Sequence, residues 1–196
     1  MVDIASDPRL DPRIKAMLAA FPTLPQDNAV DRDTLVAEAN TPEALENLAQ
    51  MQGAFAMLDT EEVAPSAGLD ISTKVFESFP DGNAINVQFI RPQSEQALPC
   101  VYYIHGGGMQ TMSCYDGMYK SWGRIIAQQG VAVAMVDFRN CLNASSAPEI
   151  EPFPAGLNDC VSGVKWVLDN ATDLGQNWPV VISGSASLMR RGNIAR

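Results

Sequence analysis

The chain has 196 residues, of which 46% are apolar and 18% charged, and its formal net charge is −10. This composition is typical of a folded globular protein and excludes an extensively disordered chain. An acidic surface is repelled by phosphate groups, so we expect no nucleic-acid partner and no anionic membrane partner.

The cysteines give no indication of a metal or redox site. Cys100, Cys114, Cys141 and Cys160 include no C-x-x-C pair, so neither a zinc ribbon nor a redox dithiol is predicted. The first residues show neither the basic nor the apolar part of a signal peptide, and no apolar run is long enough to span a bilayer. We therefore expect a cytoplasmic protein with no cofactor, no metal and no membrane span.

Residues 1–68 are predicted to form a helical cap region. Apolar residues recur with helical spacing over residues 11–21, and prolines end that segment. Thr41-Pro42-Glu43 combines a hydroxyl N-cap, a proline in the first helical position and an acid in the first turn. A second helix is therefore expected from Pro42 to about Leu58.

Residues 69–196 are predicted to form an incomplete α/β core. Asp81-Gly82-Asn83 separates two strand-like runs at 71–79 and 85–90, which predicts a hairpin. Further strands are expected at 99–104, 131–138 and 180–182, and helices at 118–129 and 154–170. The first helix places Trp122, Ile125 and Ile126 on one side, and the second carries apolar residues including Leu157 and Val161. Buried strands alternating with such helices predict an α/β fold with a mostly parallel sheet covered on both faces.

A glycine loop, His105-Gly106-Gly107-Gly108, follows the strand expected at 99–104. Without Cβ atoms, the backbone N–H groups of such a loop can converge on one point. Two converging N–H groups stabilise the oxyanion that develops during acyl transfer. The alternative is an ordinary turn after a strand.

Two further blocks extend this loop into a family pattern. They are Val136-Asp137-Phe138-Arg139 and the series Pro148-Glu149, Phe153-Pro154-Ala155, Asp159 and Trp166. In order and spacing, the three blocks resemble the bacterial hormone-sensitive-lipase-like esterases of the α/β-hydrolase superfamily. One departure lies inside the pattern, because residues 142–147 are inserted after Asn140-Cys141 where that family has Leu-Ala.

The resemblance implies a carboxylesterase acting on small-molecule esters by serine chemistry. It implies an oxyanion hole at Gly106, Gly107 and Gly108, with donors at Gly107 and Gly108. His105, the only histidine, could be read as a general base, but the resemblance implies that its ring shapes the loop. It also suggests a framework ion pair between Asp137 and Arg139, and that Asp159 caps or anchors its helix.

The expected G-x-S-x-G nucleophile motif is not clear in this sequence. Ser185 follows the strand at 180–182, but serines stand at positions 183 and 187 where the motif has glycine. These serines could instead simply end the strand. No histidine or carboxylate follows Ser185, so we expect a truncated or altered form that is inactive alone.

Residues 176–196 are expected to be a divergent tail, because arginines stand where a buried helix should begin. The tail could pack against the acidic body, or it could be a frameshifted or alternative terminus, which we favour. Two other functions stay open. One is a catalytically dead isoform that self-associates or pairs with a full-length chain through exposed strand edges. The other is an acyl-binding module that uses the helical face at 45–55.

Overall fold

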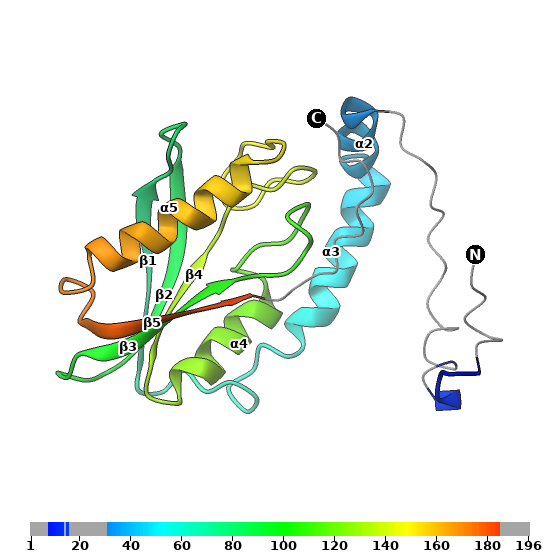
Figure 1. Cartoon of the computed structure of the whole chain (residues 1–196). Coiled ribbons are helices and arrows are strands. Elements are labelled where there is room, and N and C mark those ends of the chain that lie inside the picture. Colours follow the sequence, from blue (N-terminus) through cyan, green and yellow to red (C-terminus); the bar gives the residue numbers. More distant parts are fainter. Residues whose placement is uncertain (1–7, 14, 16–30, 185–196) are drawn as a thin grey trace. The chain divides into compact units, whose positions relative to one another are not determined.

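A computed structural model describes residues 8–13, 15 and 31–184 of the chain (Figure 1). The chain divides into two compact units, residues 1–30 and 31–196. In the first unit, Pro12, Arg13 and Lys15 are helical, and the rest of the helix predicted at 11–21 lies outside the described residues. The remaining description concerns the second unit.

A five-stranded mixed sheet with the order β1-β2-β4-β3-β5 forms the centre of this unit. Its strands are β1 (Leu69–Glu77), β2 (Ala84–Pro92), β3 (Leu98–Ile104), β4 (Ala132–Val136) and β5 (Gln176–Gly184). The predicted hairpin is confirmed, since β1 and β2 pair antiparallel and Gly82 adopts a φ of 76° between them. β2 is also antiparallel to β4, whereas β3 runs parallel to both β4 and β5.

Strand β5 is longer than the sequence predicted. It begins at Gln176, where Leu98 is its partner on β3, and it continues to Gly184, which lies opposite Ile104. The first part of the predicted divergent tail is therefore a strand of the sheet. Since β5 pairs only with β3 in the described structure, it forms one edge of this sheet.

Helices cover both faces of the sheet, as predicted (Figure 1). α5 (Ala155–Asp169) packs on one face, where Cys160 and Val167 join a core with Ile85 and Tyr102. α4 (Gly117–Ala127) packs on the other face, where α3 (Pro42–Ala56) adds Leu48 and Phe55 to a second core. No helix in the described part of the chain has both the length and the apolar character needed to cross a bilayer.

The first two helices of this unit, α2 and α3, begin at side-chain N-caps. α2 (Arg32–Ala39) starts at Asp31, whose carboxylate accepts from the backbone N–H of Thr34 at 2.8 Å. α3 starts after Thr41, whose hydroxyl accepts from the N–H of Ala44 at 3.2 Å. The helix start predicted from Thr41-Pro42-Glu43 is confirmed.

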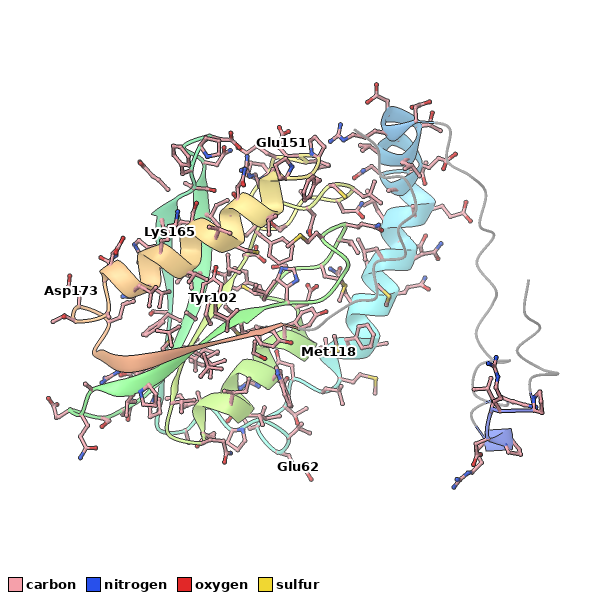
Figure 2. The ribbon with its side chains drawn as sticks, in the orientation of Figure 1. Glu62, Tyr102, Met118, Glu151, Lys165 and Asp173 are labelled. Atoms are coloured by element: carbon pink, nitrogen blue, oxygen red, sulfur yellow. The ribbon has the colours of Figure 1, made fainter. Side chains whose placement is uncertain are left out.

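Several large apolar residues of α4 and α5 lie away from the sheet. Trp122, Leu157 and Val161 are 47%, 43% and 46% exposed. Several of the buried positions hold small residues, and a Cβ on Gly163 would overlap the hydroxyl of Tyr102, which lies beneath α5 (Figure 2). Close approach of helix and sheet therefore decides these faces more than side-chain size does.

Candidate active site

The glycine loop lies at the carboxyl end of β3, the edge at which open α/β sheets place their ligands. Its chain reverses sharply, because the carbonyl of Gly107 accepts from the N–H groups of Gln110 at 3.0 Å and Thr111 at 3.4 Å. Gly107 and Gly108 have φ values of 100° and 67°. A Cβ on Gly107 would overlap the Thr111 carbonyl, so only glycine fits there.

Two hydrogen bonds fix the orientation of the peptide groups in this loop. The Gly106 carbonyl accepts from the His105 ring at 2.8 Å, and the Gly107 carbonyl accepts within the turn. In a planar trans peptide, the N–H of the next residue points opposite to the carbonyl. The N–H groups of Gly107 and Gly108 therefore point away from the donors that bind these carbonyls, and neither donates to a protein group among the described residues.

His105 is enclosed by protein. Its ring stacks on Phe138 with centroids 4.2 Å apart and lies 5.4 Å from the ring of Tyr119. Burial lowers its pKa below the ordinary value of 6.5, and the nearby Asp137 carboxylate opposes this shift only partly. The ring is therefore neutral at neutral pH, with the proton on Nδ1 because that nitrogen faces the Gly106 carbonyl.

The other ring nitrogen of His105 faces Asp137. The distance from Nε2 to Asp137 Oδ1 is 3.7 Å, which is too long for a hydrogen bond, and both side chains are fully buried. Both ring nitrogens thus face protein groups. In this arrangement His105 is placed to hold the loop, whereas a general base would need a nitrogen free to take a proton from a nucleophile.

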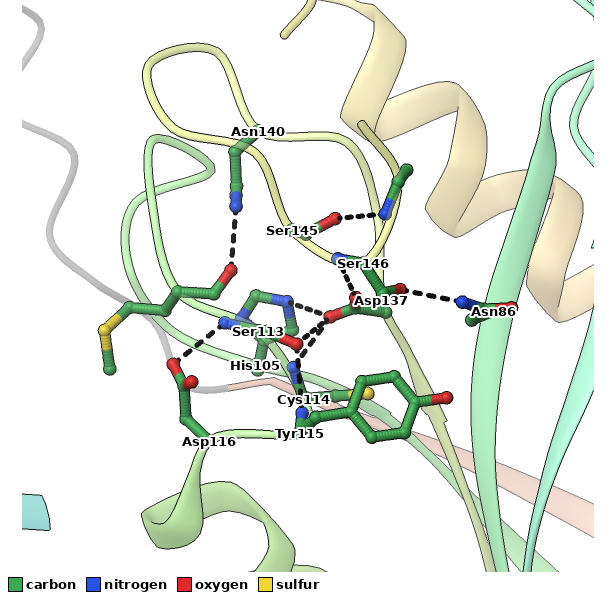
Figure 3. Close-up of polar contacts among 12 residues, drawn as sticks. Asn86, His105, Ser113, Cys114, Tyr115, Asp116, Asp137, Asn140, Ser145 and Ser146 are labelled. Atoms are coloured by element: carbon green, nitrogen blue, oxygen red, sulfur yellow. Dashed lines mark hydrogen bonds and ion pairs between the residues drawn. The ribbon is translucent and has the colours of Figure 1, made fainter. Parts of the chain in front are cut away.

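Asp137 joins three segments next to the glycine loop (Figure 3). Its carboxylate accepts from the Ser113 hydroxyl at 2.7 Å, from the N–H of Cys114 at 2.8 Å and from the N–H of Ser146 at 2.7 Å. The predicted ion pair between Asp137 and Arg139 is wrong. The oxygens of Asp137 are already occupied by these loop donors, and Arg139 reaches other carboxylates.

Arg139 binds the carboxylate of Asp159 through Nε at 3.0 Å and through a terminal nitrogen at 2.8 Å. It also reaches the β1–β2 turn, at Asp81 (2.9 Å) and Asn83 (3.0 Å). Asp159 raises the pKa of Arg139 through these hydrogen bonds, so the guanidinium stays charged. The carboxylate of Asp159 also accepts from the N–H of Arg139. Asp159 thus anchors α5 to the end of β4.

The described part of β5 ends beside the glycine loop. Ser183 pairs with Tyr103 and Gly184 with Ile104, so the described part of β5 ends level with the start of the glycine loop. The candidate nucleophile Ser185 lies outside the described residues. An open, largely apolar cavity of about 430 Å³ lies between this strand end and α4, lined by Tyr103, Tyr119, Trp122 and Ser183 among others.

Sequence reasoning missed two supports of the loop. The ring of Tyr119 lies 5.4 Å from the His105 ring, and Asn140 donates from Nδ2 to the Met112 carbonyl at 2.7 Å. Asn140 directly follows the Val136–Arg139 block at the end of a buried strand, which was the one signal that pointed to it.

Comparisons with known proteins identify the family of this chain. A BD-FAE family model matches residues 88–187, about half of the chain. Carboxylesterase NlhH of Mycobacterium tuberculosis is 28% identical over 171 residues, covering 86% of this chain and 44% of the relative. The chain thus spans about half the length of the curated relatives it matches.

Solved structures show the same fold. Esterase Est22 is 51% identical with a TM-score of 0.83, over 93% of this chain and 54% of that chain. Brefeldin A esterase, a bacterial homologue of human hormone sensitive lipase, is 30% identical with a TM-score of 0.67, over 91% of this chain and 49% of that chain. The chain belongs to the BD-FAE family, among the hormone-sensitive-lipase-like esterases with the α/β-hydrolase fold.

Proposed function

We propose that this chain provides the oxyanion-binding part of a carboxylic ester hydrolase. The observation that supports this most strongly is the orientation of the Gly107 and Gly108 N–H groups, set by the hydrogen bonds of the two preceding carbonyls. Donors fixed in advance stabilise the negative oxygen of a tetrahedral intermediate without having to reorganise. Gly106 and His105 then act as loop-shaping residues, and a small-molecule ester is the substrate class.

We further propose that the 196-residue polypeptide alone does not turn over esters. A serine nucleophile needs a base within hydrogen-bond reach, and the only histidine has both nitrogens directed at protein groups. Ser185 is the candidate nucleophile, but it lacks the glycine neighbours of the nucleophile motif.

Hydrolysis of p-nitrophenyl butyrate tests this second proposal, and Est22 offers a comparison because it has been solved with p-nitrophenol. We expect the purified chain and its Ser185→Ala variant to release p-nitrophenol at the same background rate. Turnover well above background that is lost in Ser185→Ala would show that the chain carries its own nucleophile and base.

Binding of an anion tests the oxyanion loop without turnover. The chain has 14 glycines, so ¹⁵N-glycine labelling gives a simple amide spectrum. Titration with sodium butyrate, whose carboxylate resembles the oxyanion, is expected to shift the Gly107 and Gly108 resonances, while 1-butanol leaves them unchanged. If butyrate leaves both resonances in place, these N–H groups are not the donors.

Self-association is a second candidate function, supported by the exposed edge at β5. Val181 and Ile182 are 54% and 59% exposed. Because successive residues of a strand point to opposite faces, β5 is exposed on both faces at this point. Unprotected apolar edges pair readily with other strands. Sedimentation velocity is expected to show a dimer that Ile182→Lys converts to a monomer, and a monomeric wild-type chain would exclude this function.

A further inference from the structure

The glycine loop continues into backbone that needs outside support. Met109 and Met112 have φ values of 57° and 78°, in the left-handed region that side-chain-bearing residues rarely adopt. Such conformations persist only where the surrounding structure fixes them. The contacts that fix residues 109–112 therefore also determine where Gly107 and Gly108 lie.

Residues 140–143 make those contacts. The N–H of Cys141 donates to the Met109 carbonyl at 2.9 Å, and Asn140 Nδ2 donates to Met112. The N–H groups of Leu142 and Asn143 both donate to the Gln110 carbonyl, at 3.1 and 3.0 Å. This segment ends in the insertion that separates the chain from the sequence pattern of its family.

The other side of the same segment binds the cap. Asn143 Nδ2 donates to the Ala39 carbonyl at 2.9 Å, and Asn40 Nδ2 donates to the Leu142 carbonyl at 2.7 Å. Ala39 is the last residue of α2, where helix carbonyls have no partner within the helix. Leu142 therefore donates with its N–H to Gln110, two residues after the glycine loop, and accepts from Asn40 with its carbonyl.

We propose that residues 140–143 form a strut through which helix α2 positions the glycine loop, with Asn40 and Asn143 as positioning residues. A substrate that moves the cap would then move the donors at Gly107 and Gly108. This makes the oxyanion loop sensitive to what the cap contacts. The role of this strut in catalysis rests on the proposed ester hydrolysis. The structural coupling between α2 and the glycine loop does not.

The coupling is testable in the ¹⁵N-glycine spectrum of the whole chain. Asn143→Ala removes the bond to Ala39 without touching the glycine loop directly, and Asn40→Ala removes the bond to Leu142. Both variants are expected to shift or broaden the Gly107 and Gly108 resonances. Gln93→Ala is the matched control, because it removes one amide hydrogen bond of 3.0 Å, to Asp70 on the hairpin.

The core glycines Gly123 and Gly163 report whether each variant folds, and they are expected to keep their wild-type positions. If Asn143→Ala does not fold, Asn40→Ala decides the question. Wild-type resonances for Gly107 and Gly108 in a folded variant would overturn the proposal. So would equal shifts in Gln93→Ala. This measurement uses neither ester turnover nor butyrate. A negative result in the ester assay would therefore not change the conclusion about the coupling.

Discussion

Arg139 binds two carboxylates that differ greatly in solvent exposure. This difference allows a direct test of how much the buried ion pair stabilises the fold. Asp159 is fully buried and binds the Arg139 guanidinium twice, whereas the Asp81 side chain is 43% exposed. Losing the buried partner leaves an incompletely compensated charge in the core, at a cost of about 3–5 kcal/mol. Losing an exposed partner costs about 1 kcal/mol or less. We therefore expect Asp159→Asn to be far more destabilising than Asp81→Asn.

Urea unfolding followed by tryptophan fluorescence measures both losses, and Trp166 on α5 reports directly on the anchored helix. The expected result is a free energy of unfolding lower by about 3 kcal/mol in Asp159→Asn and by less than about 1 kcal/mol in Asp81→Asn. Equal losses, or a loss below about 1 kcal/mol for Asp159→Asn, would refute the reasoning. A double variant, Arg139→Met with Asp159→Leu, should recover most of the loss because no charge stays buried.

Three further changes test the packing and the ionisation of the core. Tyr102→Phe removes the bond to the Cys160 carbonyl, and chemical denaturation should show a loss of about 1 kcal/mol because one buried hydrogen bond is lost. Gly163→Ala forces a methyl group against the Tyr102 hydroxyl and Phe76, which should lower thermal stability by about 1–3 kcal/mol, while an alanine at exposed Gly53 should not. Because burial lowers the pKa of His105 below 6.5, the unfolded chain binds a proton that the folded chain does not. Stability should therefore be fully present above pH 6.5 and fall below it, by up to about 1.4 kcal/mol per pH unit. His105→Gln should abolish this slope in urea titrations between pH 7.5 and 5.5, and an unchanged slope would contradict the assignment.

The sequence predicted well those structural elements that are determined by a few neighbouring residues. Asp81-Gly82-Asn83 sets a turn through backbone freedom, and Thr41-Pro42 sets a helix start through one hydrogen bond and one fixed φ. The sequence identified the apolar residues of α4 and α5 but not which of them face the sheet. Trp122 is exposed, and the sheet meets α4 at Gly123, where a Cβ would overlap the Met135 sulfur. Which residues of a helix face the sheet depends on how closely the helix approaches the sheet. A local sequence pattern does not contain that distance.

The difference between local and long-range causes also explains which parts of the candidate site could be predicted from the sequence. A glycine loop can be read from sequence because only glycine permits its backbone, so the residue type and the geometry are tied. Several supports of the loop use main-chain donors, which every residue except proline has, so these supports leave no signal in the sequence. Asp137 takes two of its three donors from backbone N–H groups, and Leu142 supports the loop entirely through its backbone. The insertion that looked like a departure from the family is therefore where support for the oxyanion loop should be sought, and Asn143, 103 residues from Asn40 in sequence, shows why only the fold could reveal it.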